Sequence, residues 1–209
     1  MLTLSLDTAL SAATAVVARD DRVLAVRCVE MARGHQEAIA VLTQAAMAEA
    51  GLAFAALDRI GVVVGPGSFT GLRVGIAFAK GLGLAWKTPL AGIGSLEALR
   101  ASATGGRIAA AIDAGRGQVY LQTEGAPEQR PLEEALAVIA RFRPDVIVGS
   151  AAALLADAAR DARREARAFA DPAALARLTL QASAPVEAPR PLYLRAPDAR
   201  TLAERGVAR

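Results

Sequence analysis

The chain has 209 residues, of which 54% are hydrophobic and only 4% aromatic, and its formal net charge is +3. This length allows one large or two small domains, with a core built mainly from alanine, valine and leucine. Cys28 is the single cysteine, which excludes an internal disulfide and a cysteine-cluster metal site. Without a recognisable signal peptide or a run of about 18 charge-free apolar residues, we expect a cytoplasmic protein that does not cross a membrane.

The first hundred residues contain strand and helix patterns in a regular order. Three short runs predict an antiparallel meander: Leu2–Asp7, Ala13–Arg19 and Val23–Val29. An apolar stripe of helical period then extends from His35 to Gly51, where the glycine is a natural stop. A strand, a helix and another strand are expected at Ile60–Val64, Leu72–Trp86 and Pro89–Ile93.

The second half of the chain begins in a similar way. After a helix at about 96–106, the predicted strand Ile108–Ile112 ends in Asp113, as the first strand of the chain ends in Asp7. The remaining predicted elements are a hairpin strand at 118–123, a helix at 132–141, a strand at 145–149 and an alanine- and arginine-rich helix at 151–167. The two strands that end in aspartate suggest a duplicated architecture, with halves at 1–100 and 101–184 and a proline-rich tail at 185–209.

One segment between the fourth strand and its helix is more informative than the rest of the chain. This signature turn consists of Gly65, Pro66, Gly67, Ser68, Phe69, Thr70 and Gly71. Its glycines permit backbone angles closed to other residues, and Ser68 or Thr70 can cap the following helix. The segment matches neither the P-loop nor the dinucleotide-binding fingerprint. Two interpretations stay open: an anion-binding turn, or a tight turn made for packing.

Motifs along nearly the whole chain resemble one family. They are Asp7-Thr8, Gly34-His35, the signature turn with Leu72-Arg73, Gly94–Leu99, Asp113–Tyr120 and Pro191–Pro197. Together they resemble the TsaB (YeaZ) family, whose members are subunits of the bacterial complex that makes threonylcarbamoyladenosine in tRNA. Family members often carry Asp-Ala-Arg where this chain has Asp113, Ala114 and Gly115, followed by Arg116, which weakens a specific role for the arginine.

The resemblance implies an α/β, actin-like ATPase (ASKHA) fold of two ribonuclease-H-like halves, each a mixed sheet with helices. It implies a non-catalytic scaffold that binds the transferase TsaD, which modifies the adenosine beside the anticodon, while the small ATPase TsaE docks against the pair. It further implies no cofactor of the chain's own, with ATP or ADP and Mg²⁺ expected only at the junction with partners. Contact with tRNA is expected through the complex, and a homodimer is an alternative state of the isolated chain.

Three residues are candidates for nucleotide binding: Asp7, Thr8 and Asp113. In actin-like ATPases, as the resemblance implies, an aspartate at the end of the first strand orients a magnesium-bound water, and Asp113 would be its counterpart. Residues 9–12 contain no glycine that could grip phosphates, which favours a structural role for Asp7 and Thr8. A stand-alone ATPase or phosphotransferase remains the alternative function.

Metal-dependent and protease chemistry lack the necessary residues. A metal site like that of TsaD needs two histidines about one helical turn apart, whereas His35 is the only histidine. A protease triad of His35, Ser68 and Asp7 is rejected, because a lone histidine before a helix is usually a cap or an interface residue. No catalytic residue is therefore assigned.

The helices at about 36–50 and 72–86 are apolar on more than one side, which indicates an interaction surface. The alternative is that both helices are simply sandwiched inside the domain. The resemblance places the partner contact on them, and the candidate residues are His35, Ile39, Leu42, Ala46, Leu72, Arg73, Gly75, Ile76, Ala79, Lys80 and Gly83. Arg73 and Lys80 could pair with partner carboxylates, meet a phosphate at the junction, or remain solvated.

Overall fold

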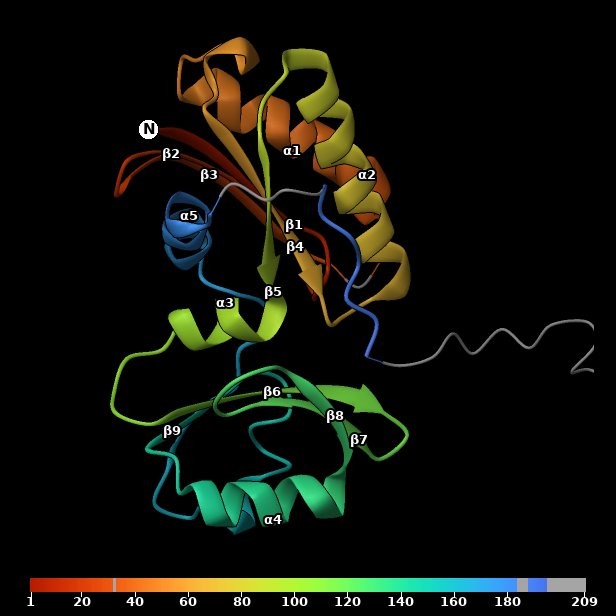
Figure 1. Cartoon of the computed structure of the whole chain (residues 1–209), viewed down its shortest axis with the longest axis vertical. Coiled ribbons are helices and arrows are strands. Elements are labelled where there is room, and N and C mark those ends of the chain that lie inside the picture. Colours follow the sequence, from red (N-terminus) through yellow and green to blue (C-terminus); the bar gives the residue numbers. More distant parts are fainter. Residues whose placement is uncertain (32, 184–187, 195–209) are drawn as a thin grey trace, which may run out of the picture.

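The computed structural model describes residues 1–31, 33–183 and 188–194, whose strands form two five-stranded sheets (Figure 1). The first contains β1 (Leu2–Asp7), β2 (Ala12–Arg19), β3 (Arg22–Glu30), β4 (Arg59–Gly65) and β5 (Leu90–Gly94), in the order β3-β2-β1-β4-β5. The second contains β6 (Ile108–Gly115), β7 (Gln118–Gln122), β8 (Glu128–Pro131), β9 (Val146–Val148) and β10 (Arg163–Glu165), in the order β10-β9-β6-β7-β8.

The two sheets have the same topology. In each, the first three strands form an antiparallel meander, β1 to β3 and β6 to β8. The fourth strand of each half pairs parallel with the first, and the fifth pairs parallel with the fourth. The suggested duplication of the architecture is therefore confirmed at the level of topology.

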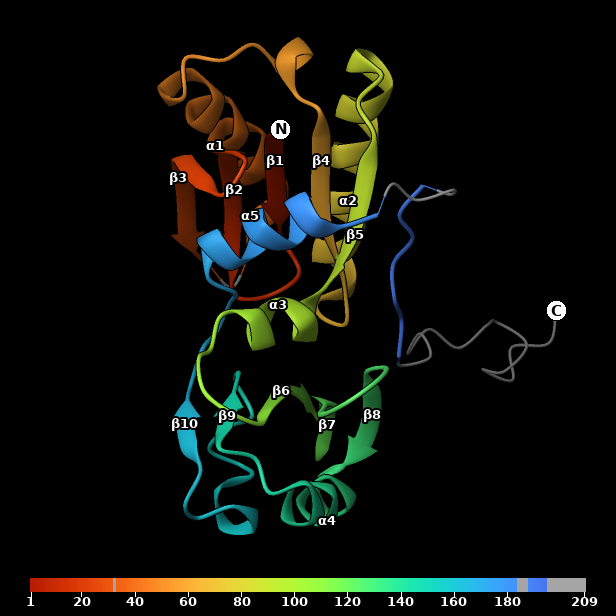
Figure 2. The same cartoon turned by 60° about the vertical axis from the view of Figure 1, so that its left-hand side comes forward.

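Helices cover both faces of the first sheet (Figures 1 and 2). The helices α1 (His35–Glu49) and α2 (Phe69–Trp86) lie on one face, and α5 (Pro172–Gln181) crosses the other. The short helix α3 (Ser95–Ala101) contacts strands of both sheets, and α4 (Leu132–Phe142) packs on β7 and β8. Two short 3₁₀ turns are η1 (Phe54–Ala56) and η2 (Ala156–Ala158). None of the helices in the described ranges has the length and apolar character needed to cross a membrane.

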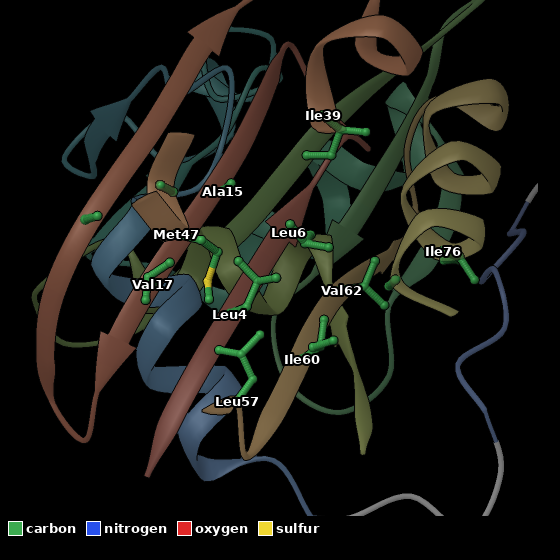
Figure 3. Packing of buried hydrophobic residues seen from close by; sticks show 13 residues of the cluster. Leu4, Leu6, Ala15, Val17, Ile39, Met47, Leu57, Ile60, Val62 and Ile76 are labelled. Atoms are coloured by element: carbon green, nitrogen blue, oxygen red, sulfur yellow. The ribbon is translucent and has the colours of Figure 1, made fainter. Parts of the chain in front are cut away.

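A core of aliphatic side chains fills the space between the first sheet and the helices α1 and α2 (Figure 3). Leu4 and Leu6 of β1 belong to this cluster together with Ile60 of β4. Ile39 of α1 and Ile76 of α2 complete it from the helical side. Each such side chain, when fully buried, stabilises the fold by about 1.5–3 kcal/mol.

The opposite face of β1 carries hydroxyl groups, and α5 covers them. The Ser5 and Thr179 hydroxyl oxygens lie 2.7 Å apart and share a hydrogen bond. A Cβ atom at Gly61 of β4 would overlap the Thr179 side chain, so this glycine allows α5 to approach the sheet. The alternation of leucine with Thr3 and Ser5 in β1 thus separates an apolar core face from a polar face that is also buried.

The predicted helix at 151–167 is wrong. This segment forms turns, η2 and the strand β10, in which Arg163 pairs with Val146 of β9. Ala151, Ala152 and Leu155 are buried in the core of the second half. Alanine content is only a weak indicator of helix, and strand pairing together with core packing overrides it here.

Among the strands and α-helices, the sequence does not predict β8, β10 or α5. The start of α5 does carry a local signal, since the Asp171 carboxylate caps the Ala173 and Ala174 N–H groups and Pro172 is the first helical residue. Its residues fall within the predicted second half, 101–184, yet the helix packs on the first sheet. Residues 185–187 and 195–209 of the predicted tail lie outside the described residues.

Candidate functional site

The signature turn connects the end of β4 to the start of α2. Gly65 adopts a φ of 113°, which is open to glycine but strained for other residues. Ser68 is the N-cap of α2, and its hydroxyl accepts a hydrogen bond from the Gly71 N–H at 3.2 Å. Of the two predicted caps, Ser68 therefore has this role, because its oxygen satisfies an N–H group that the helix itself leaves unpaired.

The turn packs tightly against the loop that follows β1. The Ser68 N–H donates to the Ala9 carbonyl at 2.8 Å, and the Thr8 hydroxyl donates to the Gly71 carbonyl at 2.7 Å. A Cβ atom at Gly67 would overlap the Ala9 carbonyl, and one at Gly71 would overlap the Thr8 carbonyl. The glycines are needed for this close approach of two backbones, so the geometry supports the packing interpretation of the turn.

The two aspartates at the strand ends make the same local hydrogen bond. An Asp7 carboxylate oxygen accepts from the Ala9 N–H at 2.8 Å, and an Asp113 carboxylate oxygen accepts from the Gly115 N–H at 2.8 Å. Asp7 is buried, and burial raises its pKa from 3.8 to about 6 even though the Ala9 hydrogen bond lowers it. Asp113 is exposed, and its own N–H donates to the Ser150 hydroxyl.

Apolar side chains occupy the region beside these aspartates. Leu10, directly after the Asp7–Ala9 turn, packs in one cluster with Ala114 and Leu194. The Nε2 atom of His35 lies 3.0 Å from the Leu10 carbonyl oxygen, and this hydrogen bond connects the start of α1 to the same turn. After Asp7, residues 9–12 contain no glycine and the Ala9 N–H is already bonded to the Asp7 carboxylate, unlike the glycine-rich hairpins that bind phosphates. The contacts of Asp7, Thr8 and Asp113 support a structural role instead.

Most of the predicted partner-binding residues pack inside this chain. Seven of them are buried: Ile39, Ala46, Leu72, Gly75, Ile76, Ala79 and Gly83. His35 and Leu42 are half-buried, while Arg73 and Lys80 are exposed. The buried side chains cannot contact a partner from these positions, because they pack beneath the surface of α1 and α2. For them, the sandwiched alternative describes the structure correctly.

A different set of residues forms the apolar surface of these helices. On α2, the exposed face includes Arg73, Ala77, Lys80, Gly81 and Leu84, and Leu84 is 84% exposed. On α1, Val41 is 64% exposed. Nothing lies within 4 Å of a Cβ atom placed at Gly81, so this part of the face is open. The spacing of this face follows the helical period, but both sides of α2 are apolar, so the sequence alone does not show which of the two is exposed.

Comparisons with known sequences agree with the motifs. The family model described as "TsaD: tRNA N6-adenosine threonylcarbamoyltransferase" matches residues 26–143. An uncharacterized protein of Mycobacterium tuberculosis is 38% identical over 206 residues, which cover 96% of this chain and 94% of that protein. The tRNA threonylcarbamoyladenosine biosynthesis protein TsaB of Bacillus subtilis is 32% identical over 122 residues, which cover 57% of this chain and 53% of that protein.

Solved structures show the same fold. YeaZ from Pseudomonas aeruginosa superposes with a TM-score of 0.77 at 24% identity, covering 92% of this chain and 99% of that chain. An activator of 2-hydroxyisocaproyl-CoA dehydratase from Clostridium difficile superposes with a TM-score of 0.56 at 9% identity, covering 87% of this chain and 94% of that chain. Together with the duplicated topology, these neighbours confirm the predicted actin-like ATPase (ASKHA) fold.

Proposed function

The chain belongs to the TsaB (YeaZ) family, and we propose that it is a non-catalytic scaffold subunit in the synthesis of threonylcarbamoyladenosine in tRNA. In this role it binds the transferase TsaD and keeps it competent to modify the adenosine beside the anticodon. The half of the chain that carries α1 and α2 makes the contact.

The observation that carries this proposal is the exposed apolar surface on α1 and α2. Leu84 is 84% exposed and Val41 64% exposed, on helices whose opposite sides are already buried in the core. The outer face of an ordinary surface helix is polar, so large exposed aliphatic groups on two neighbouring helices indicate a protein contact. Ala77 and Gly81 are exposed between Arg73 and Leu84, and such small residues let a partner helix approach closely.

Two further features support a scaffold rather than a catalyst. The signature turn holds the start of α2 against Thr8 and Ala9 by two hydrogen bonds, one from the Thr8 hydroxyl and one to the Ala9 carbonyl, which fixes the helix on the sheet. The carboxylates of Asp7 and Asp113 each accept a hydrogen bond from their own turn, and Leu10 packs beside them. Both aspartates therefore stabilise their own turns, a structural role that needs no substrate.

The same proposal includes the other members of the complex. TsaE docks against the pair, and tRNA is contacted through the assembled complex in the cytoplasm. ATP or ADP with Mg²⁺ belongs to the junction with the partners and not to this chain alone. A homodimer of the isolated chain would use the same surface of α1 and α2 and would compete with TsaD for it.

Size-exclusion chromatography with light scattering tests the proposal directly. The chain, mixed with TsaD of the same organism, is expected to form a one-to-one complex, and Leu84→Glu is expected to abolish it. Leu154→Glu is the matched control, because Leu154 is a 46% exposed leucine in the second half. Circular dichroism should show that both variants are folded. The proposal is overturned if folded wild-type chain and folded TsaD do not associate.

A further inference from the structure

We infer that residues 188–194 form a strap that fixes Arg73 on the surface of α2, and that this arginine receives a carboxylate of the partner protein. The inference rests on the proposed function, since it names the chemistry of one contact in that interface. It is carried by Phe69 and Arg73 of α2 together with Tyr193, which lies 120 positions after Arg73 in the sequence.

The strap is held along the edge of the first sheet. Its Leu192 N–H donates to the Val64 carbonyl at 2.7 Å. The pairing of β4 with β5 shifts between Val63 and Gly65, so Val64 lies outside the regular ladder and its carbonyl is open to the strap. A Cβ atom at Gly65 would come within 2.9 Å of the Leu192 carbonyl, so glycine is needed here too.

Tyr193 is anchored on both sides in the sequence. Leu192 makes the hydrogen bond to β4, and Leu194 packs in the cluster that contains Leu10 and Ala114, between the two halves of the chain. The path of the segment beside the first half is visible in Figures 1 and 2. Because its neighbours are fixed in this way, the Tyr193 ring has a defined position although it is 39% exposed.

Both Tyr193 and Phe69 contact the Arg73 guanidinium. The Arg73 Nε–H donates to the Tyr193 hydroxyl at 3.0 Å, and the Arg73 Cζ lies 3.8 Å from the centroid of the Phe69 ring. The two rings are themselves in contact, with centroids 5.1 Å apart. The cation–π contact and the hydrogen bond restrict the guanidinium to one orientation on the surface.

The remaining edge of the guanidinium is available to a partner. In the described part of the chain, no carboxylate forms an ion pair with Arg73. With Nε already bonded to Tyr193, the two terminal nitrogens present the planar fork that binds a carboxylate in bidentate fashion. The N–H groups of Ser68 and Gly71 nearby already have partners, so neither of them is a donor for a phosphate.

The position of Arg73 relates this contact to the apolar surface. It lies near the start of α2, on the exposed face that continues through Ala77, Lys80 and Gly81 to Leu84. A partner helix packed on that face would place an aspartate or glutamate opposite Arg73 at its end. A preoriented arginine at the rim of an apolar contact fixes the register of the partner, because side-chain entropy need not be lost on binding.

Isothermal titration of TsaD with variants of this chain tests the inference. Arg73→Gln is expected to raise Kd about tenfold, and Arg73→Lys about fivefold because lysine lacks the fork. Tyr193→Phe removes only the hydroxyl and is expected to raise Kd about threefold. Arg22→Gln is the charge-matched control at an exposed arginine on β3, and its Kd is expected to equal that of the wild type.

The double variant decides whether Tyr193 acts through Arg73. Once the guanidinium is gone, losing the hydroxyl should have no further effect, so Arg73→Gln with Tyr193→Phe should bind as Arg73→Gln alone does. Additive effects overturn the positioning role of Tyr193. A wild-type Kd for folded Arg73→Gln overturns the inference alone, whereas failure of the wild-type chain to bind TsaD overturns it together with the proposed function.

Discussion

The two halves of the chain share their strand order but differ in what lies between the fourth and fifth strands. Both β4 and β9 run into a glycine with positive φ, Gly65 at 113° and Gly149 at 117°. Both first strands end in an aspartate that binds the N–H group two residues later. These shared features are the ones that turn the chain at the strand ends, which is why a duplicated topology retains them.

The differences lie in the helices. After β4 the first half has the 18-residue helix α2, whereas after β9 the second half has only turns and η2 before β10. Helices cover both faces of the first sheet, and Asp7 is buried there, while Asp113 is exposed. The element found in only one half is the one that carries the exposed apolar face. The comparison therefore separates residues that hold the fold from residues that are open to a partner.

The largest expected effect comes from the contact between α2 and the β1 turn. A methyl group at Gly71 would overlap the Thr8 carbonyl, so Gly71→Ala should destabilise the chain by about 3 kcal/mol. The matched variant Gly81→Ala meets nothing within 4 Å and should stabilise the chain by about 0.5–1 kcal/mol. Urea unfolding of the two variants measures both values. Equal midpoints would contradict the role given to the signature turn.

The next effect distinguishes the two aspartates by pH. The folded-state pKa of Asp7 is about 6 and its ordinary value 3.8, so the folded state binds more protons between these values. Stability should therefore fall as the pH rises from about 4 to 6, and the full penalty, up to about 3 kcal/mol, should remain at pH 7. Asp7→Asn keeps an oxygen for the Ala9 N–H and should remove the penalty, raising the melting temperature at pH 7 but not below pH 4.

The exposed counterpart is the control for this prediction. Asp113→Asn makes the same substitution at an exposed position, where there is no burial penalty to remove, so it should not raise the melting temperature at pH 7. A wild-type chain whose stability does not change between pH 4 and 7 would contradict the account of Asp7. The Asp7 variant also distinguishes the scaffold from the alternative function. A stand-alone ATPase of this superfamily would lose ATP turnover in the variant, whereas a scaffold would keep its binding to TsaD.

The smallest expected effect concerns the cap of α2. Ser68→Ala removes the hydroxyl that accepts from the Gly71 N–H, and should cost about 1 kcal/mol. In the second half, α4 begins after Pro131 without a side-chain cap, so Pro131→Ala should cost less than Ser68→Ala. Thermal unfolding of the two variants compares them. A cost for Ser68→Ala near zero would show that the turn holds α2 without its cap.

Local patterns predicted the parts of the fold that depend on local causes. The meander, α1, α2, α4 and the paired aspartates follow from apolar periodicity and turn residues, and the structure confirms them. The helix predicted at 151–167 is wrong because residues 163–165 pair with β9, and no local sequence pattern predicts this pairing. The position of α5 on the first sheet depends on Gly61 and Thr179, which no sequence spacing connects.

The candidate site was harder to predict than the fold. The resemblance predicts partner contacts at apolar residues of α1 and α2, but periodicity does not tell which side of a two-sided apolar helix faces the core. Ala79 is an example, since it is completely buried and a charge there would test folding and not binding. The hydrogen bond between Arg73 and Tyr193 joins residues 120 positions apart, and no sequence pattern predicts it.

Hydrogen–deuterium exchange of the chain with and without TsaD tests the central claim most directly, because it reports both halves in one measurement. The account predicts slower exchange in α1 and α2 on binding, with no change between β9 and β10 in the second half. Protection confined to the second half, with unchanged exchange in α2, would contradict the claim that α2 carries the partner surface.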